Sequence, residues 1–416
     1  MTEINPYGGA LNGDCPWYVA RREDNVIFDR LAQGEGCYVR TSHQMGKSSL
    51  VVRLIDSFRK SGISAVAIDL TAFGRVLSPA QWYNALALRV GRELHLEDEF
   101  DAFWTAHKSL APFERFSQAL QCVALPAVRG RLILFVDEMD LLRSLPFSPD
   151  EFLGAIHSTA TRCDRDGLEL DRLVFCLFAT VAPPALWRNS ERANCTLGRV
   201  SALEDFEREE LFAVIDGLAR CLLEKNQLSV PPGLPATKFM LGEILDRVFH
   251  WTQGQPYLTQ KLGCAATRSL SDQLRWLAEI TPAHCQQVVD DLCERLFTST
   301  SAREQDCHLL WIRQKLLSGG LHPFRVFELL ERVRRGTPAA FAVDDESECL
   351  ISSGVVRIRE GYLEMRNRIY EQVFEDRWLA IRSRAQESPT RFSFPPLPTI
   401  FTQNCSVLPE AITSGN

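Results

Sequence analysis

The chain has no hydrophobic run long enough to cross a bilayer. Its longest apolar stretch, from Leu173 to Trp187, is interrupted by Pro183 and Pro184, whereas a membrane-spanning helix needs about 20 continuous apolar residues. The stretch before Asp24 contains acidic side chains and no apolar segment of signal-peptide length. We therefore expect a cytoplasmic protein that is not secreted and has no membrane partner.

Paired cysteines and spaced metal ligands are also missing. The 13 cysteines are scattered from Cys15 to Cys405 and never form a CxxC pair, which argues against a disulfide framework or a zinc ribbon and favours reduced thiols. The eight histidines are dispersed, so a metal site apart from one at a bound nucleotide is not expected. GxSxG and HExxH motifs are absent, which leaves phosphoryl transfer as the only hydrolytic chemistry with recognisable residues.

The sequence has no basic surplus. Its 53 acidic residues outnumber 46 basic ones, for a net charge of -7, whereas proteins that bind nucleic acid electrostatically are usually basic. Internal repeats with a period of about 20 to 50 residues are absent too, which excludes a solenoid or propeller within this chain. A hydrophobic content of 45% over 416 residues is sufficient for two or three globular cores.

The first half of the sequence alternates apolar strand candidates with helices. The strand candidates are Cys37–Arg40, Ser64–Leu70, Leu132–Glu138 and Leu173–Thr180. The helix candidates are Arg22–Leu31, Ser48–Lys60, Pro79–Leu94, Pro112–Val123 and Pro149–Thr161. Strands that are apolar throughout and alternate with helices predict an α/β fold, with a doubly wound, mainly parallel sheet covered on both faces.

The most specific motif follows the first strand candidate. Its sequence, TSHQMGKSS, matches the phosphate-binding loop GxxxxGK[ST] except that Thr41 replaces the first glycine. Backbone N–H groups of such a loop bind anions at a helix N-terminus, Lys47 supplies a charge for the β- and γ-phosphates, and the Ser48 hydroxyl can ligate Mg²⁺. The predicted nucleotide-binding residues of this loop are Thr41, Ser42, His43, Gln44, Met45, Gly46, Lys47, Ser48 and Ser49.

Two carboxylates end the third strand candidate. Asp137 and Glu138 stand where P-loop enzymes hold Mg²⁺ and activate water. We expect Asp137 to share Mg²⁺ with Ser48, and Glu138 to orient or deprotonate the attacking water. The alternative, that they only cap a loop after a buried strand, leaves Lys47 unexplained. Asp140 is expected to cap the next turn.

Thr180 ends the fourth strand candidate. In a doubly wound sheet it would emerge at the carboxyl edge beside the phosphates, where a hydroxyl can read either the γ-phosphate or the attacking water. A threonine that only satisfies the backbone at a strand end is equally compatible with the sequence. Both interpretations stay open at this stage.

The second half of the chain has a different pattern. Helical periodicity begins near Ser201 and continues to about Phe341, where a helix, a strand, a glycine-containing turn, a strand and a helix follow, as in a winged helix. Arginines in this last segment allow a DNA-binding interpretation, but acidic residues nearly cancel them. Nucleic acid is therefore a possible partner that the sequence does not favour.

Several blocks together resemble the AAA-like ATPase domain family of bacterial, notably cyanobacterial, proteins related to the STAND signalling NTPases. The blocks are GGAL, YVARRED, CYVRTSHQMGKSSL, AIDLTAFG, QWYNAL, ILFVDEMD, FATVAPPALW, WTQGQPYLTQKL and RNRIYEQVF. They extend from about residue 7 to residue 378, which is most of the chain. Each block alone has little specificity, but the combination is specific.

The resemblance implies roles that spacing alone does not. Tyr18 and Arg21 resemble the family's segment near the nucleotide base, and Gly254–Pro256 resembles the Gly-x-Pro motif with which a helical lid contacts the nucleotide. Arg199 resembles an arginine that reports on the γ-phosphate or reaches a neighbouring chain. Arg21 and Pro256 are therefore candidate nucleotide contacts, and Arg199 joins Lys47, Glu138 and Thr180 as a candidate catalytic residue.

The sequence also departs from the family pattern. His43 replaces a frequent arginine, and Thr41 replaces the glycine of the general motif, although this family often lacks that glycine. Slow or weak hydrolysis is therefore expected.

With the resemblance, five parts are expected along the chain. They are an N-terminal segment (1–30), a P-loop AAA-like nucleotide-binding domain (31–200), a helical lid (201–300), a winged-helix-like domain (301–384) and a flexible tail (385–416). In STAND proteins a winged helix resembles an autoinhibitory or packing module more often than a DNA reader.

The function that follows is an Mg²⁺-dependent ATPase acting as a conformational switch, with a protein partner or self-association. The alternatives are a nucleotide-dependent scaffold without hydrolysis and a DNA-associated loader that uses the winged helix.

Overall fold

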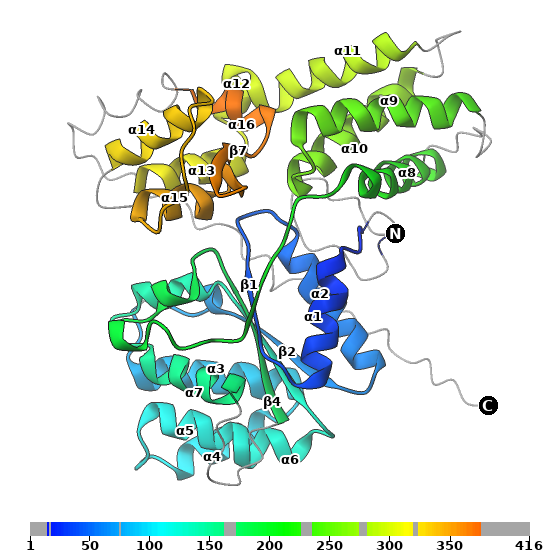
Figure 1. Cartoon of the computed structure of the whole chain (residues 1–416). Helices are drawn as coiled ribbons and strands as arrows, with labels where there is room; N and C mark the ends of the chain where they lie inside the picture. Colours follow the sequence, from blue (N-terminus) through cyan, green and yellow to red (C-terminus); the bar gives the residue numbers. More distant parts are fainter. Residues whose placement is uncertain are drawn as a thin grey trace, which may run out of the picture.

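The structure of the chain is a computed structural model. The structure describes residues 15, 18–74, 76–161, 172–225, 235–273, 281–318 and 323–375. The predicted tail, residues 385–416, lies outside the described residues, as do residues 1–14 and 376–384. Figure 1 shows an α/β part below and a largely helical part above it.

Among the described residues, a five-stranded sheet forms the centre of the α/β part. Its strands are β1 (Cys37–Arg40), β2 (Ser64–Asp69), β3 (Leu132–Asp137), β4 (Leu173–Ala179) and β5 (Arg199–Ala202). They are ordered β2-β3-β4-β1-β5, and every neighbouring pair is parallel. The predicted doubly wound parallel sheet is confirmed.

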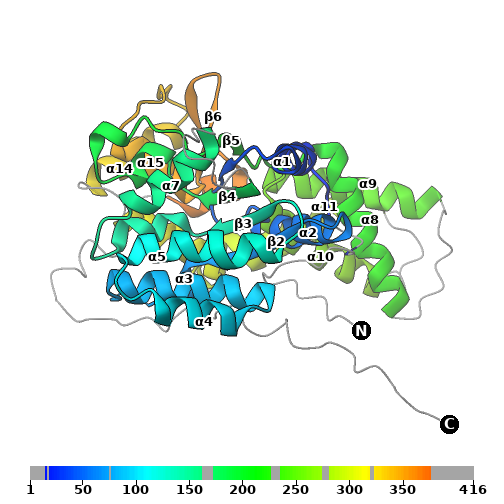
Figure 2. The same ribbon diagram turned by 90° about the horizontal axis from the view of Figure 1, so that it is seen from below.

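Helices cover both faces of this sheet, as Figure 2 shows from below. They are α1 (Arg22–Gln33), α2 (Lys47–Lys60), α3 (Pro79–Leu94), α4 (Glu97–Ala106), α5 (Pro112–Ala119), α6 (Leu125–Ala127) and α7 (Asp150–Thr161). Side chains on a strand point alternately to its two faces. Accordingly Cys37 and Val39 pack in the core with α1 and α2, whereas Tyr38 packs in the core with α3, α5 and α7. Because both faces are buried, β1, β3 and β4 have nearly continuous apolar sequences.

The fifth strand, β5, was not predicted. Its four residues, Arg199–Ala202, are mostly exposed and lack both an apolar run and a clear alternation. The strand lies at the sheet edge and is held by its pairing with β1, a long-range contact that a local sequence pattern does not encode. The predicted boundary at residue 200 falls inside it.

The upper part contains the remaining helices and a hairpin. The helices are α8 (Arg208–Lys225), α9 (Pro235–Thr252), α10 (Pro256–Gln273), α11 (Pro282–Cys293), α12 (Thr300–Arg303), α13 (Cys307–Ser318), α14 (Pro323–Arg334), α15 (Asp345–Ser353) and α16 (Arg368–Val373). The strands β6 (Val356–Arg359) and β7 (Tyr362–Met365) form the antiparallel hairpin. We call α8–α11 the lid and residues 307–375 the C-terminal module.

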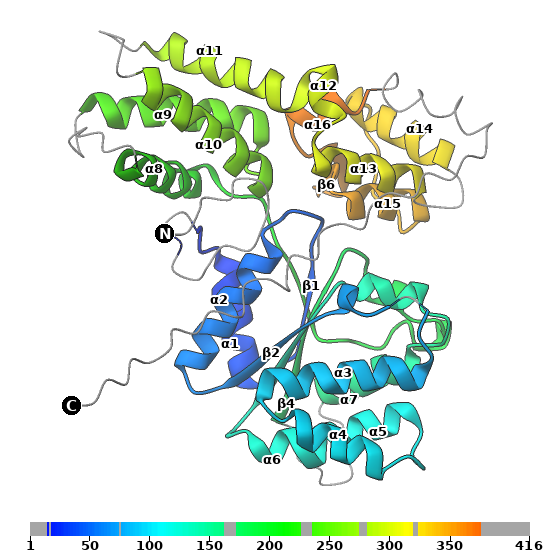
Figure 3. The same ribbon diagram turned by 180° about the vertical axis from the view of Figure 1, so that it is seen from behind.

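The lid and the C-terminal module share one hydrophobic core. It joins Leu211 and Leu258 of the lid to Leu309, Leu350 and Tyr370 of the module. Within the module, three helices precede the hairpin, which is the order of a winged helix. Figures 1 and 3 show that both parts lie over the edge of the sheet where β1 ends. Among the described helices, none has the length and apolar character to cross a membrane.

Candidate nucleotide site

The predicted P-loop connects β1 directly to α2. Its first residue, Thr41, is buried and donates its backbone N–H to the Ala179 carbonyl of β4 at 2.9 Å. Gly46 has φ 83° and precedes the first helical residue, Lys47. This left-handed conformation favours glycine, and a side chain at Gly46 would also meet the Arg21 guanidinium at 3.0 Å.

The N-terminus of α2 is suited to an anion. The first backbone N–H groups of a helix have no partner within the helix, and the helix dipole places positive charge there. The described first turn of α2 holds no acidic side chain. Ser48 lies half-buried in this turn and Ser49 is buried beside it. The geometry is that of a phosphate-binding loop.

Lys47 meets both predicted carboxylates. Its Nζ lies 2.7 Å from Asp137 Oδ1 and 2.5 Å from Glu138 Oε1. Burial alone would lower the pKa of Lys47, but the two carboxylates outweigh it and raise the pKa above its ordinary value. The structure therefore brings the predicted phosphate-binding cation, the candidate metal ligand and the candidate general base together.

The two carboxylates differ in their surroundings. Burial raises the pKa of Asp137, against the effect of the Lys47 ammonium. For Glu138, burial acts in the same direction, but Lys47 outweighs it and the pKa lies below its ordinary value. Glu138 is therefore ionised at neutral pH, the state that accepts a proton from water.

The backbone at Glu138 allows this convergence. Glu138 has φ 58° and ψ 42°, a left-handed conformation that is uncommon outside glycine and that often occurs at functional sites. Its N–H donates to Asp137 Oδ1 at 2.6 Å. The turn directs two successive side chains to the same lysine.

Thr180 lies at the carboxyl end of β4, where the sequence places it. Its N–H and its hydroxyl both donate to the Asp140 carboxylate, at 2.7 and 2.9 Å. Asp140 therefore ties the turn after β3 to the end of β4. The expectation that it caps its own turn is wrong, because the N-cap residue there is Glu138 and no side chain caps the turn.

Arg21 contacts the P-loop through its guanidinium. Its Nη2 donates to the Met45 carbonyl at 3.0 Å, and its Nη1 donates to the Glu204 carbonyl at 3.2 Å. The side chain is almost fully buried and its guanidinium faces the Phe206 ring. Tyr18 donates its hydroxyl to Asp24 at 2.7 Å. Arg21 thus joins the loop to the chain that leads into the lid.

The predicted lid motif also contacts the P-loop. Gln255 Nε2 donates to the Gln44 carbonyl at 3.2 Å, and Pro256 is buried at the start of α10. Gly254 has φ 81°, and a Cβ there would lie 2.0 Å from the Phe206 carbonyl oxygen. Glycine is therefore required for this close approach between the lid and the incoming chain.

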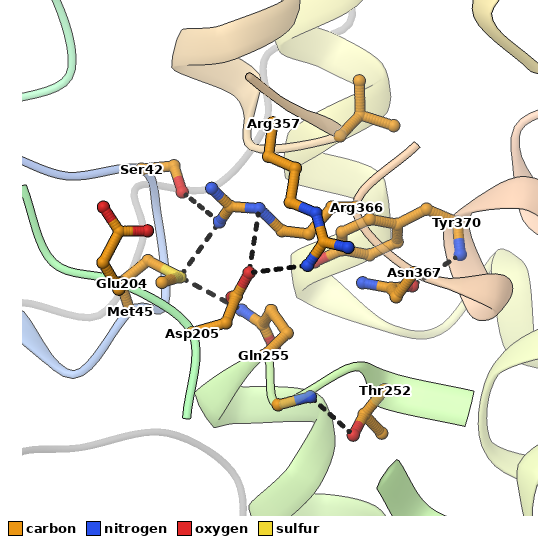
Figure 4. Close-up of polar contacts among 12 residues, drawn as sticks. Ser42, Met45, Glu204, Asp205, Thr252, Gln255, Arg357, Arg366, Asn367 and Tyr370 are labelled. Atoms are coloured by element: carbon orange, nitrogen blue, oxygen red, sulfur yellow. Dashed lines mark hydrogen bonds and ion pairs between the residues drawn. The ribbon is translucent and has the colours of Figure 1, made fainter. Parts of the chain in front are cut away.

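The C-terminal module reaches the P-loop through Arg366 (Figure 4). Arg366 Nη1 lies 3.0 Å from Ser42 Oγ and 3.1 Å from Met45 Sδ, and its Nε lies 3.7 Å from Asp205 Oδ2. Burial raises the pKa of Asp205, while Arg366, Arg357 and Arg21 act to lower it. One buried carboxylate is thus surrounded by arginines from the N-terminal segment and the module.

A second contact with the module involves His43. Its ring stacks on Trp311 at a centroid distance of 4.3 Å, and its Nδ1 lies 3.4 Å from His308 Nδ1. Burial lowers the pKa of His43 to about 4, with Lys47 acting in the same direction and Glu138 against it. His43 is therefore neutral in the folded protein at neutral pH.

This pKa shift predicts a pH dependence of stability. An unfolded histidine has a pKa of about 6.5, so the unfolded chain binds a proton between about pH 6.5 and 4 that folded His43 does not. The stability that neutral His43 provides is therefore complete above about pH 6.5 and is lost as the pH falls toward 4. From pH 7 to pH 5 we expect the wild type to lose about 1 to 2 kcal/mol more than His43→Phe, measured by urea unfolding. Equal losses in both proteins would contradict the prediction.

Arg199 is not brought to this site. It pairs in register with Cys37, the first residue of β1, whereas the P-loop follows Arg40, the last residue. Its side chain is 71% exposed and its ion-pair partner is Glu35, at 3.9 Å. This position gives no support to a contact with the γ-phosphate of the same chain, and a reach to a neighbouring chain stays a prediction.

Sequence reasoning missed Arg366, Asp205 and Trp311 as residues around the P-loop. A signal existed for Arg366, because it lies in the block RNRIYEQVF that carries the family resemblance. Its positive charge suggested a contact with DNA instead. Its partner in the structure, Ser42, is 324 residues away in the sequence, so no local pattern connects the two residues. Asp205 and Trp311 gave no comparable signal.

Residues 7–212 match the family described as the AAA-like domain. We call this segment the AAA-like domain, after the family that it matches. It contains the P-loop, both carboxylates and the whole parallel sheet. The AAA-like domain therefore carries the candidate site, and the lid and the C-terminal module contact its P-loop.

Other proteins are similar to this chain in sequence or in structure. An uncharacterised WD repeat-containing protein of Synechocystis is 27% identical over 388 residues, which are 91% of this chain and 31% of that protein. The chain thus spans about a third of that relative's length. The Walker-type ATPase PABY2304 of Pyrococcus abyssi is similar in structure, with a TM-score of 0.50 and 13% identity, covering 90% of this chain and 100% of that one. The latter similarity shows the fold alone.

Proposed function

We propose that this chain binds and hydrolyses Mg-ATP and that its nucleotide state changes how the lid and the C-terminal module pack on the AAA-like domain. One observation carries the proposal. Arg21, Gln255 and Arg366 come from three different parts of the chain, and all contact residues 42–45 of the P-loop. A ligand in the loop that alters these contacts biases the packing of all three parts.

The chemistry follows from the side chains at the carboxyl edge of the sheet. Lys47 and the loop N–H groups would hold phosphate charge, and Glu138 would accept a proton from the attacking water. Ser48 and Asp137 supply the hydroxyl and carboxylate oxygens that suit Mg²⁺. The contacts of Lys47 with both carboxylates support the fit of these residues to Mg-ATP, because they bring the phosphate-binding and metal-binding groups together. Mg²⁺, when bound, neutralises charge on the β- and γ-phosphates.

Calorimetric titration with ATP and ADP, with and without Mg²⁺, combined with phosphate-release kinetics, tests this function. We expect Mg²⁺-dependent ATP binding and slow turnover. A chain that binds no nucleotide under these conditions would overturn the proposal.

The switch predicts a specific role for Arg366. Arg366→Ala removes contacts with Ser42, Met45 and Asp205 and leaves a buried carboxylate with less compensation, so it should cost about 1 to 3 kcal/mol in stability. It should also make cleavage by trypsin independent of whether ATP or ADP is present, because the module no longer senses the loop. Arg359→Ala is a matched control, since Arg359 lies on the hairpin that directly precedes Arg366 and its side chain is 68% exposed.

Arg366→Ala and Arg359→Ala should differ in whether trypsin cleavage depends on the bound nucleotide. Arg359→Ala should keep the wild-type difference between the ATP and ADP digestion patterns. If Arg366→Ala also keeps that difference, Arg366 does not couple the module to the loop.

The alternative functions have less support. A DNA-associated loader requires a basic face on the module, but Arg334 and Arg335 pair with Glu331, and Arg357 pairs with Glu364. Stimulation of ATPase activity by duplex DNA, with salt-dependent binding, would favour the loader. A scaffold without hydrolysis would function unchanged after loss of the general base.

A further inference from the structure

Thr180 lies between the two halves of the candidate site. The sheet order places β4 between β3, which ends at Asp137, and β1, which leads into the P-loop. The residue before Thr180, Ala179, accepts a hydrogen bond from Thr41 of the loop. A side chain at the end of β4 is therefore next to the phosphate-binding loop on one side and the carboxylates on the other.

Asp140 holds Thr180 in a fixed orientation. Its Oδ2 accepts from the Thr180 N–H at 2.7 Å, and its Oδ1 accepts from the Thr180 hydroxyl at 2.9 Å and from the Val181 N–H at 3.2 Å. On the other side, Arg40 Nε donates to the Thr180 carbonyl at 3.2 Å. The backbone bonds locate the carboxylate independently of the hydroxyl.

These contacts determine what the hydroxyl can still do. A threonine hydroxyl has one hydrogen to donate and two lone pairs to accept with, whereas an ionised carboxylate only accepts. The Thr180 hydrogen must therefore point to Asp140, in a charge-assisted bond that is stronger than a neutral one. Toward groups other than Asp140, the Thr180 oxygen can therefore only accept hydrogen bonds, through its lone pairs. It can accept from water, and it cannot donate to a phosphate oxygen while the bond to Asp140 exists.

We propose that Asp140 is a positioning residue that fixes Thr180 Oγ1 as an acceptor for one hydrogen of the attacking water, so that Thr180 orients the water and does not bind the γ-phosphate. This inference rests on the proposed ATPase function. In the step, the water oxygen bonds to the γ-phosphorus while the bond from that phosphorus to the bridging oxygen breaks. One water proton passes to Glu138, the other stays on the oxygen that becomes part of inorganic phosphate, and ADP leaves.

Binding of ATP and ADP separates this role from a phosphate contact. The dissociation constants are measured for Thr180→Val and Thr180→Ser in a Glu138→Gln background, which prevents turnover during the titration. Valine has the same shape without the hydroxyl, and serine keeps the hydroxyl. If Thr180 does not touch the γ-phosphate, the ratio of ATP to ADP affinity stays within about threefold in both variants.

Turnover is then measured with Glu138 intact. We expect Thr180→Val to lower kcat by about 10- to 100-fold and Thr180→Ser to retain most of it, because a positioned acceptor contributes on this scale. A fall of about tenfold in the ratio of ATP to ADP affinity in Thr180→Val would overturn the inference. An unchanged kcat in Thr180→Val would overturn it as well. If the wild type binds no ATP, the proposed function fails first and the inference fails with it.

A double-mutant cycle tests Asp140 itself. An Asp140→Asn side chain can donate to Thr180 and release its hydrogen, so this change should lower kcat in the wild type and have little further effect in Thr180→Val. Equal losses in the two backgrounds would mean that Asp140 only holds the strand ends together, and would overturn the positioning role. Thermal unfolding of the four proteins accompanies the cycle, so that loss of folded protein is not counted as loss of turnover.

Discussion

Lys47→Ala is expected to weaken ATP binding by at least about 100-fold, or about 2.7 kcal/mol. The ammonium is the cation that meets Asp137 and Glu138, and without it the phosphates would face two uncompensated carboxylates. Calorimetric titration with Mg-ATP measures the effect. ADP binding should fall as well, since the β-phosphate depends on the same lysine.

The control for this change concerns folding. Removing Lys47 leaves two carboxylates in a buried site without their partner, which can cost about 3 to 5 kcal/mol. Circular dichroism and thermal unfolding therefore accompany the titration, together with Lys47→Arg, which keeps a positive charge and should retain more stability. A folded Lys47→Ala protein that binds ATP like the wild type would show that the loop does not bind phosphate.

Glu138→Gln is expected to lower kcat by about 100- to 1,000-fold while ATP affinity stays the same or rises. Glutamine keeps the shape of the side chain and cannot accept the water proton. It also removes one negative charge next to Lys47, so the phosphates face less repulsion. Single-turnover phosphate release, compared with ATP titration on the same protein, measures the separation of binding from chemistry.

Glu209→Gln is a suitable control because Glu209 lies exposed in the first turn of α8, within the lid. It should turn over ATP at the wild-type rate. If Glu138→Gln hydrolyses ATP as fast as this control, Glu138 is not the general base. If the wild type itself binds ATP and never hydrolyses it, the scaffold function replaces the ATPase.

The core of the site was predictable because its signals are local. The P-loop is a continuous segment whose residue types are dictated by the need to expose backbone N–H groups to phosphate. Asp137 is the last residue of a strand whose other residues are all apolar because it is buried on both faces, and Glu138 is the next residue after that strand. The convergence of Lys47 with these carboxylates then follows from the parallel sheet, in which strand ends meet at one edge.

The contacts around the P-loop were not predictable in the same way. Arg366 and Ser42 are 324 residues apart, and His43 and His308 are 265 residues apart. No periodicity or motif records which surface of a helical module faces a loop. The Thr180 hydroxyl is a further case, because its two possible roles are distinguished only by the direction of its hydrogen, and Asp140 sets that direction.

The sequence by itself determined the alternation of β1 to β4 with α1, α2, α3, α5 and α7, the P-loop motif and the two carboxylates, since each depends on neighbouring residues and on burial patterns that repeat locally. The tertiary structure alone decided the short edge strand β5, the distance of Arg199 from the loop and the attachment of Arg366 to Ser42. These depend on pairing and packing between distant segments, and their free energy comes from contacts that exist only once the chain has folded.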